Sequence, residues 1–183
     1  SGLHKLAIQQ NVRGRKTSFS ISASKFLIAV GTKPFRPKSI PFNGTTVIDS
    51  DSVAANLPMP KSITVVGGGV IGLEYATIFS TLDIPVTVVE ARERILEFID
   101  HDIVANFVHQ LTDRGIGLRL GRTIDKISLD DHGHPNILLD DGRQLRSGML
   151  LFTAGRVGAV DSLGLEKVGL KCDSRGRLVV NKE

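Results

Sequence analysis

The sequence predicts an α/β fold: a Rossmann-like βαβαβ parallel sheet with a three-stranded β-meander, flanked by short β segments. Three observations carry this prediction. The apolar strand 63–66 breaks into a glycine-rich turn that opens a helical pattern. A second apolar strand, 86–90, ends in a lone carboxylate. Short strands separated by turn residues then follow from 123 to 145. Strands that alternate with helices indicate a parallel sheet, whereas short strands joined by tight turns indicate an antiparallel one.

The composition is that of a soluble globular protein and argues against several partners. The 183 residues are 41% hydrophobic and 23% charged, and the net charge of +4 is too small and scattered to indicate nucleic acid. No apolar run approaches the roughly 20 residues that span a bilayer, and no signal peptide opens the chain. The single cysteine, Cys172, indicates a reducing compartment. We therefore expect a cytoplasmic protein with no membrane or metal partner, in which His132 and His134 are exposed turn residues.

The first 60 residues predict short elements and a connecting stretch. Residues 3–9 and 17–22 alternate loosely around a basic turn, which predicts a hairpin. The apolar run 25–30 predicts a further strand. Residues 49–57 predict a short helix, because an Asp-Ser-Asp run offers its N-cap and a Pro-Met-Pro run ends it.

Helices and strands alternate in the middle of the chain. The helix at about 70–82 is expected to face the sheet with its apolar set: Ile71, Tyr75, Ile78, Phe79 and Leu82. A second helix, capped by Asp100 and ended by Gly115, is expected to turn inward Ile103, Val104, Phe107, Val108 and Leu111. Apolar strands are predicted at 116–120 and 149–153, and the meander strands are predicted at 123–129, 136–139 and 143–145.

The glycine-rich turn has the spacing of a dinucleotide fingerprint in its required setting of strand, turn, helix, strand and acid. Gly67 permits the tight turn off the strand. Gly69 leaves room for a pyrophosphate to approach the backbone, and Gly72 lets the helix lie close to the strand. The helix N-terminus then directs unpaired N–H groups and about half a positive charge at the phosphates.

Glu90 stands near the spacing of about 20 residues at which such folds carry the ribose-binding acid. A carboxylate there accepts hydrogen bonds from the ribose hydroxyls and repels a 2′-phosphate, which favours NAD(H) over NADP(H). Two alternatives stay open. Glu90 could be a solvated strand end, and Arg92 or Arg94 could receive a 2′-phosphate instead of being surface charges.

The order of elements and three segments resemble the NAD(P)-binding domain of the flavin-dependent pyridine nucleotide–disulfide oxidoreductase family. Residues 25–37 resemble the passage from the FAD domain, 49–76 resemble the entry into the NAD domain, and 152–156 (FTAGR) resemble the return segment. Within the family, 94–100 and 155–177 are similar to the soluble FAD-containing transhydrogenases. Ala159-Val160 departs from their usual Asn-Thr, and dihydrolipoamide dehydrogenases share much of the pattern.

The resemblance implies cofactor sites but no catalytic residue within this chain. Val70 would cover the nicotinamide pocket, Glu74 would lie near the meeting of nicotinamide and flavin, and Gly155 would bring backbone to the nicotinamide half. A helix-face carboxylate paired with a lysine is the alternative for Glu74. The implied NAD(P) residues are Gly67, Gly69, Val70, Ile71, Gly72, Glu74, Glu90, Arg92 and Gly155. FAD would touch Ala29, Val30 and Gly31 only in the intact parent protein.

The predicted organisation is therefore that of a piece of a larger enzyme. Residues 1–60 would be a partial FAD-domain flank and connecting segment, 61–156 the NAD(P)-binding domain, and 157–183 a return segment toward the FAD domain. The intact parent would transfer hydride between NAD(H) and NADP(H) through FAD, with further FAD and dimerisation domains and a homo-oligomeric assembly. The chain alone is expected to be inactive. The alternatives are a dihydrolipoamide dehydrogenase-like disulfide oxidoreductase and a non-catalytic NAD-sensing module.

Overall fold

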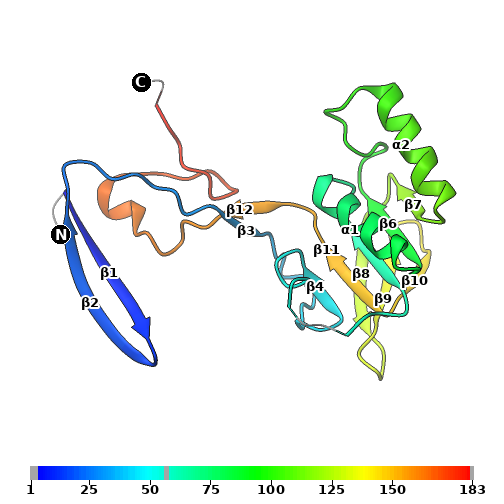
Figure 1. The fold of residues 1–183 in the computed structure, drawn as a ribbon, viewed down its shortest axis with the longest axis horizontal. Coiled ribbons are helices and arrows are strands. Elements are labelled where there is room, and N and C mark those ends of the chain that lie inside the picture. The colour runs from blue at the N-terminus through cyan, green and yellow to red at the C-terminus, as the bar shows by residue number, and fades with distance from the viewer. Residues whose placement is uncertain (1–3, 56–57, 182–183) are drawn as a thin grey trace. The chain divides into compact units, whose positions relative to one another are not determined.

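The structure is a computed structural model that describes residues 4–55 and 58–181 (Figure 1). The chain divides into two compact units. One comprises Ser1–Thr32 with Gly158–Glu183, and the other comprises Lys33–Val157. The predicted functional division at residues 60 and 156 stays a prediction, because compactness does not say which cofactor a segment binds.

A parallel sheet of five strands forms the centre of the Lys33–Val157 unit, which confirms the α/β prediction (Figure 1). Its spatial order is β4-β11-β5-β6-β7, and every neighbouring pair is parallel. The strand bounds are β4 Val47–Asp49, β5 Ile63–Val66, β6 Val86–Glu90, β7 Gly117–Leu120 and β11 Met149–Phe152. Because all five run the same way, their carboxyl ends share one edge, where ligands bind in open α/β sheets.

Both faces of this sheet are buried, which explains why its strands are almost continuously apolar. Successive side chains point to opposite faces. Val65 and Leu151 join the core beneath the helices, whereas their neighbours Val66 and Leu150 join a second core beneath the meander. The three-stranded antiparallel meander has the order β10-β9-β8, with bounds β8 Ile124–Leu129, β9 Pro135–Leu139 and β10 Gln144–Arg146. This arrangement confirms the predicted meander.

The two predicted helices form, as α1 Val70–Thr81 and α2 His101–Asp113. Asp100 caps α2 by accepting a hydrogen bond from the Asp102 N–H at 3.0 Å, and Gly115 follows its end at φ +77°. The predicted inward face of each helix was partly wrong. In α1 the buried residues are Gly72, Leu73, Ala76 and Phe79. The small residues let the helix backbone come close to the strands, and this turns Ile78 and Leu82 outward. In α2 only Val104 and Leu111 are buried, and Ile103 is exposed.

Two predicted elements before residue 60 were wrong. Residues 25–30 form no strand, since no neighbouring strand among the described residues offers them a hydrogen-bonding edge. Residues 50–55 form a hydrogen-bonded turn rather than a helix, and residues 56 and 57 of the predicted helix lie outside the described residues. The preceding Val47–Asp49 instead forms β4, a strand that the sequence pattern did not indicate. A helix this short has little stability of its own.

The other unit contains the predicted hairpin, β1 Lys5–Val12 with β2 Arg15–Ser22. Its turn is Arg13-Gly14, both at positive φ as a two-residue hairpin loop requires. A short 3-10 helix, η1 Leu165–Val168, follows later in the chain. The short strands β3 Thr32–Pro34 and β12 Arg156–Gly158, which belong mostly to the Lys33–Val157 unit, pair with each other, and neither was predicted.

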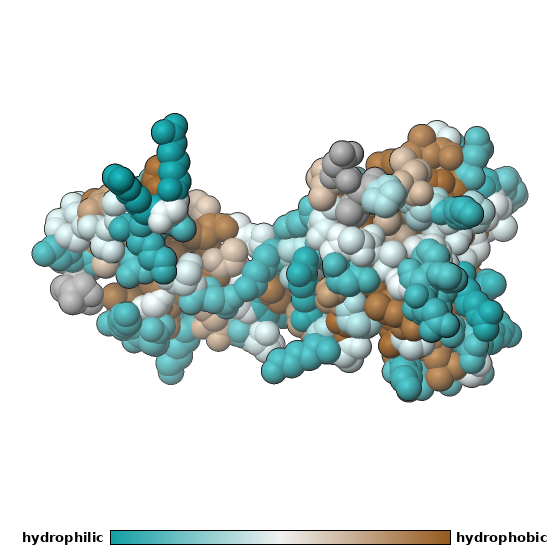
Figure 2. Space-filling view, turned by 90° about the horizontal axis from the view of Figure 1, so that it is seen from below, coloured by the Kyte–Doolittle hydropathy of each residue, from teal (hydrophilic) through white to brown (hydrophobic). Residues whose placement is uncertain are grey.

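Large apolar side chains remain at the surface among hydrophilic ones (Figure 2). Leu27 is 93% exposed and Phe98 is 73% exposed, so residues that ordinarily lie inside proteins are uncovered here. No helix in the part of the chain that the structure describes is both long enough and apolar enough to cross a membrane.

Candidate nucleotide site

The glycine turn lies at the carboxyl edge of the sheet, directly after β5, and its geometry leaves no room for a side chain at Gly67 or Gly72. Gly67 has φ +112°, a region that favours glycine, and a Cβ there would lie 2.9 Å from Thr153 Oγ1. A Cβ on Gly72 would lie 2.0 Å from the Gly67 carbonyl oxygen. Thr153 fixes the turn from the adjacent strand end by donating its hydroxyl to the Val66 carbonyl at 2.9 Å. The first helical turn of α1 therefore packs directly against the glycine-rich loop at Gly67.

Gly69 differs from these two glycines because a Cβ there would meet no atom within 4 Å. It is the N-cap of α1, yet no side chain caps the helix and no acidic residue lies in its first turn. The orphan N–H groups of a helix N-terminus require acceptors, and an anion is a suitable one. Open space over Gly69 and an uncapped helix end therefore fit the phosphates of a dinucleotide.

Gly68 was not singled out from the sequence, but it joins the turn to the acid. Its N–H donates to Glu90 Oε2 at 2.6 Å. A Cβ on Gly68 would lie 2.8 Å from the buried Ile95 side chain and 3.1 Å from Glu90 Oε2. The signal available in the sequence was the unbroken glycine triplet, whose middle member the fingerprint leaves unspecified. Thr153 was likewise visible only as the residue after an apolar strand.

Glu90 lies at the end of β6 with only 7% of its side chain exposed, which excludes the solvated strand-end alternative. Its Oε1 accepts hydrogen bonds from the Arg92 backbone N–H at 3.0 Å and from Arg92 Nε at 2.8 Å. Its Oε2 accepts from Arg92 Nη2 at 3.1 Å in addition to Gly68. Burial raises the pKa of the Glu90 carboxyl, but the hydrogen bonds from Arg92 and Gly68 outweigh it and place the pKa below its ordinary value. Glu90 is thus ionised at neutral pH.

Val70, Ile71 and Glu74 follow one another along the first turns of α1. Val70 is half exposed beside Gly69, and Ile71 is partly buried. Glu74 is exposed, and it makes no ion pair with any residue that the structure describes. The alternative of a lysine-paired carboxylate therefore finds no support within the described chain.

Gly155 follows β11 at the same edge of the sheet as the glycine turn, at φ +116°. Its carbonyl accepts a hydrogen bond from the Phe35 N–H at 3.1 Å. A Cβ on Gly155 would find only Phe35 Cβ, at 4.0 Å, so the backbone there faces open space. Gly155 thus exposes backbone on the same sheet edge as Gly67 and Gly69.

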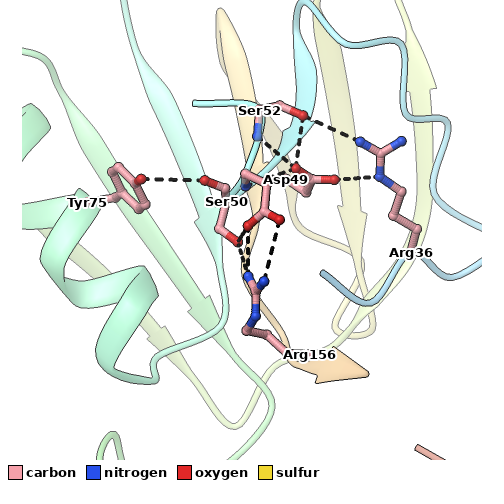
Figure 3. Close-up of polar contacts among 7 residues, drawn as sticks. Arg36, Asp49, Ser50, Ser52, Tyr75 and Arg156 are labelled. Atoms are coloured by element: carbon pink, nitrogen blue, oxygen red, sulfur yellow. Dashed lines mark hydrogen bonds and ion pairs between the residues drawn. The ribbon is translucent and has the colours of Figure 1, made fainter. Parts of the chain in front are cut away.

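A second polar cluster lies at this edge around the turn that follows β4 (Figure 3). Arg156 donates to Asp51 Oδ1 at 2.8 Å, and the Tyr75 hydroxyl donates to the Ser50 carbonyl at 3.4 Å. Asp49, which is 2% exposed, accepts from Arg36 Nε. Figure 3 shows that these side chains come together around the end of β4: Tyr75 comes from α1, Arg156 from the start of β12, and Arg36 from the segment between β3 and β4. The sequence did not indicate this cluster, because Arg36, Tyr75 and Arg156 are distant in the chain from the consecutive residues 49–52.

The residues expected to touch FAD belong to the other unit. Ala29, Val30 and Gly31 are exposed, and Gly31 adopts φ +69° and accepts a hydrogen bond from the Ala159 N–H at 3.1 Å. Their backbone is therefore ordered by residues of their own unit.

A family model described as pyridine nucleotide-disulphide oxidoreductase matches residues 2–183. The chain belongs to this family. Members of the family are flavoproteins that use nicotinamide nucleotides, and flavoprotein disulfide reductases and an NADH-bound oxidase are among the structural neighbours.

Curated relatives of this family member carry one repeated name. The soluble pyridine nucleotide transhydrogenase of Photobacterium profundum is 41% identical over 161 residues, which cover 88% of this chain and 34% of that protein. The enzyme of the same name from Vibrio parahaemolyticus is 37% identical over 179 residues, which cover 98% of this chain and 38% of that protein. The chain thus spans little more than a third of the length of these relatives.

Solved structures in the family share the fold. LpdA from Mycobacterium tuberculosis superposes with a TM-score of 0.86 at 26% identity, over 98% of this chain and 39% of that one. The water-forming NADH oxidase from Lactobacillus brevis, solved bound to NADH, has a TM-score of 0.77 at 22% identity over 94% of this chain and 38% of that one. This second likeness shows the fold alone.

Proposed function

We propose that the Lys33–Val157 unit binds NAD(H) and NADP(H) as the nicotinamide nucleotide domain of a transhydrogenase-type flavoprotein. One observation carries the proposal: an uncapped helix N-terminus opens onto free space at Gly69, beside an ionised carboxylate that is bonded to the same turn. Such a site suits a pyrophosphate next to a ribose. The transhydrogenase assignment is supported by relatives of that name at 37–41% identity.

The roles proposed for individual residues follow from their places. The Gly67–Gly72 backbone and the α1 N-terminus hold the pyrophosphate, Glu90 meets the adenosine ribose, and Arg92 lies next to the 2′ position of that ribose. Val70 covers the nicotinamide side of the turn. Ile71 lines the same helix turn, and Glu74 lies one turn further, where its free carboxylate faces the nicotinamide ring. Gly155 presents backbone to the nicotinamide half.

FAD, when bound in the intact protein, supplies the redox chemistry by taking hydride from one nicotinamide and giving it to another. This chain's part is to bind and orient the nucleotide. Ala29, Val30 and Gly31 contact FAD only once the remaining FAD-domain segments of the parent are present. The uncovered apolar side chains nearby, such as Leu27, support a partner surface in the parent protein. We accordingly propose that the chain alone binds nucleotide weakly and catalyses no transhydrogenation.

Replacement of Gly69 by valine tests the site directly. Gly69 has φ −84°, which other residues adopt freely, and a Cβ there meets nothing in the chain. We therefore expect Gly69→Val to retain the melting temperature of the wild type but to lose NADH and NADPH binding in titration calorimetry, because the side chain occupies the place of the pyrophosphate. Unchanged affinity for both nucleotides would refute the phosphate site. Flavin absorbance in the purified chain would refute its assignment as a nucleotide domain.

A dihydrolipoamide dehydrogenase-like disulfide oxidoreductase is the second candidate, favoured by the likeness to the flavoprotein disulfide reductase RclA of Escherichia coli, at a TM-score of 0.83 and 29% identity. The parent protein separates the two. A Cys-x4-Cys pair in its flavin domain and oxidation of a dithiol substrate to the disulfide, with reduction of NAD+, would support disulfide chemistry. Hydride exchange between NADH and an NADP analogue in the absence of a disulfide would support transhydrogenation. A parent that binds NADH but turns over neither substrate would fit a non-catalytic NAD-sensing module.

A further inference from the structure

The hydrogen-bonding capacity of the Glu90 carboxylate is already filled within the chain. An ionised carboxylate has about four acceptor positions on its two oxygens. Oε1 accepts from Arg92 N and Nε, and Oε2 accepts from Gly68 N and Arg92 Nη2. A ribose hydroxyl that donates to Glu90 must therefore displace one of these donors.

Of the donors to Glu90, only the Arg92 side chain can move away from the carboxylate at a modest cost in free energy. The Gly68 donor is part of the buried turn, and the backbone of 90–92 is fixed, since Arg122 N–H donates to the Glu90 carbonyl and Gly121 N–H donates to the Arg92 carbonyl. The Arg92 side chain, by contrast, is 45% exposed. Its Nη1 lies 3.8 Å from Glu97 Oε2, so a second carboxylate is close at hand if the guanidinium turns away from Glu90.

Arg92 can also meet a phosphate without leaving Glu90. A guanidinium carries five N–H donors, and side-chain donation to Glu90 involves only Nε and Nη2. The remaining donors can meet a doubly charged 2′-phosphate, for which arginine is well suited. In the same position the guanidinium offsets the repulsion between that phosphate and Glu90.

From this geometry, and resting on the proposed nucleotide site, we propose that Arg92 is the residue that sets cofactor selectivity. Arg92 competes with the ribose hydroxyls of NAD(H) for Glu90 and stays on Glu90 when NADP(H) binds. The acid alone would select NAD(H), and the arginine opposes it, so that one site accepts both nucleotides. This is the behaviour needed by a protein that moves hydride between the two.

Arg94 provides a matched control. It belongs to the same exposed segment and carries the same charge, but it makes no hydrogen bond or ion pair with the described residues. If the segment attracted phosphate only through its overall charge, loss of either arginine would weaken NADPH binding equally. If the role belongs to Arg92 alone, loss of Arg94 would leave NADPH binding almost unchanged.

The test is calorimetric titration of the chain with NADH and with NADPH for wild type, Arg92→Met and Arg94→Met. Methionine keeps most of the stem length and removes the donors. We expect Arg92→Met to bind NADH severalfold more tightly and NADPH about tenfold more weakly, the equivalent of one charge-assisted hydrogen bond. We expect Arg94→Met to change each affinity less than about twofold. An NADH affinity that is unchanged or reduced in Arg92→Met would overturn the proposal.

A second measurement observes the side chain itself. The ¹⁵N resonance of Arg92 Nε should report a hydrogen bond to Glu90 in the free chain, lose it when NADH is added and keep it when NADPH is added. If the Arg92–Glu90 hydrogen bond persists with NADH bound, Arg92 does not move. That result would overturn this inference but leave the proposed nucleotide site standing. Absence of any NADH or NADPH binding by wild type would instead overturn the proposed nucleotide site, and this inference with it.

Discussion

Two buried carboxylates end separate strands of the same parallel sheet, and their surroundings differ. Asp49 ends β4 and Glu90 ends β6. Each carboxylate residue is at most 6% exposed as a whole, and each is paired with an arginine whose side chain is about half exposed, Arg36 and Arg92 respectively. For both carboxyls burial raises the pKa, but the hydrogen bonds they accept outweigh it and lower the pKa below its ordinary value. By charge and burial alone the two sites look equivalent.

The difference lies in what each carboxylate is bonded to. Asp49 Oδ1 accepts from the N–H groups of Asp51 and Ser52 and from the Ser52 hydroxyl, which closes the turn that follows it (Figure 3). Glu90 instead bonds across the chain to the glycine turn, beside a helix end that has no cap. Asp49 accepts hydrogen bonds from the N–H donors of its own turn, so those donors are not available to a ligand. Glu90 lies beside N–H groups of the α1 N-terminus that no side chain caps, and we therefore propose a binding site at Glu90 and not at Asp49.

Removal of Asp49 should cause the largest loss of stability. Asp49→Ala leaves the N–H groups of Asp51 and Ser52 and the Arg36 guanidinium without their acceptor, and we expect a loss of about 2–3 kcal/mol in the free energy of unfolding. Chemical denaturation checks this. Asp49→Asn keeps a turn acceptor and should recover part of the loss. Nucleotide affinity measured below the melting temperature should not change, and a selective loss of NADH binding would contradict the distinction between the two carboxylates.

Replacement of Glu90 should act mainly on binding. We expect Glu90→Ala to weaken NADH about tenfold or more, since charge-assisted hydrogen bonds contribute about 1.5–3 kcal/mol and each 1.4 kcal/mol is a factor of ten. NADPH should be affected far less or should bind more tightly, because the repulsion of the 2′-phosphate disappears while Arg92 remains. Parallel titrations with both nucleotides measure this. Equal losses for the two, or none, would remove Glu90 from the ribose site.

Lowering the pH should produce the smallest effect, a gradual fall in the free energy of unfolding to which the Asp49 and Glu90 carboxyls both contribute. Each carboxyl has a lower pKa in the folded chain than when unfolded, so the unfolded chain binds more protons in acid. The stabilisation is present above the ordinary carboxyl pKa and is lost as the pH falls through the lowered folded-state value. Denaturation between pH 7 and pH 3 should show this decline, and Asp49→Asn and Glu90→Gln should each make it shallower. If the free energy of unfolding of a variant falls with pH in parallel with that of the wild type, the replaced carboxyl does not contribute to the loss of stability in acid.

Local chemistry made much of this molecule predictable. The glycine turn of 67–72, both helices, the meander and the hairpin turn depend on residues close together in the chain, where periodicity and turn preferences act. The same locality explains why the sequence indicated Gly69 and Glu90 as site residues. Their roles toward a nucleotide stay predictions, but the structure places both at one edge of the sheet.

By itself the sequence determined the βαβ unit and the acid that follows it, because hydrophobic period, glycine conformation and capping are local properties. Only the tertiary structure decided that 47–49 joins the sheet while 25–30 does not, since a strand forms where another strand offers it hydrogen bonds. It alone decided that Ala76 rather than Ile78 faces the strands, as close approach favours small side chains. The tertiary structure also decided that the Arg92 guanidinium donates to the Glu90 carboxylate. A side-chain donor bonds to whichever acceptor the fold brings within reach, and the sequence does not show which acceptor that is.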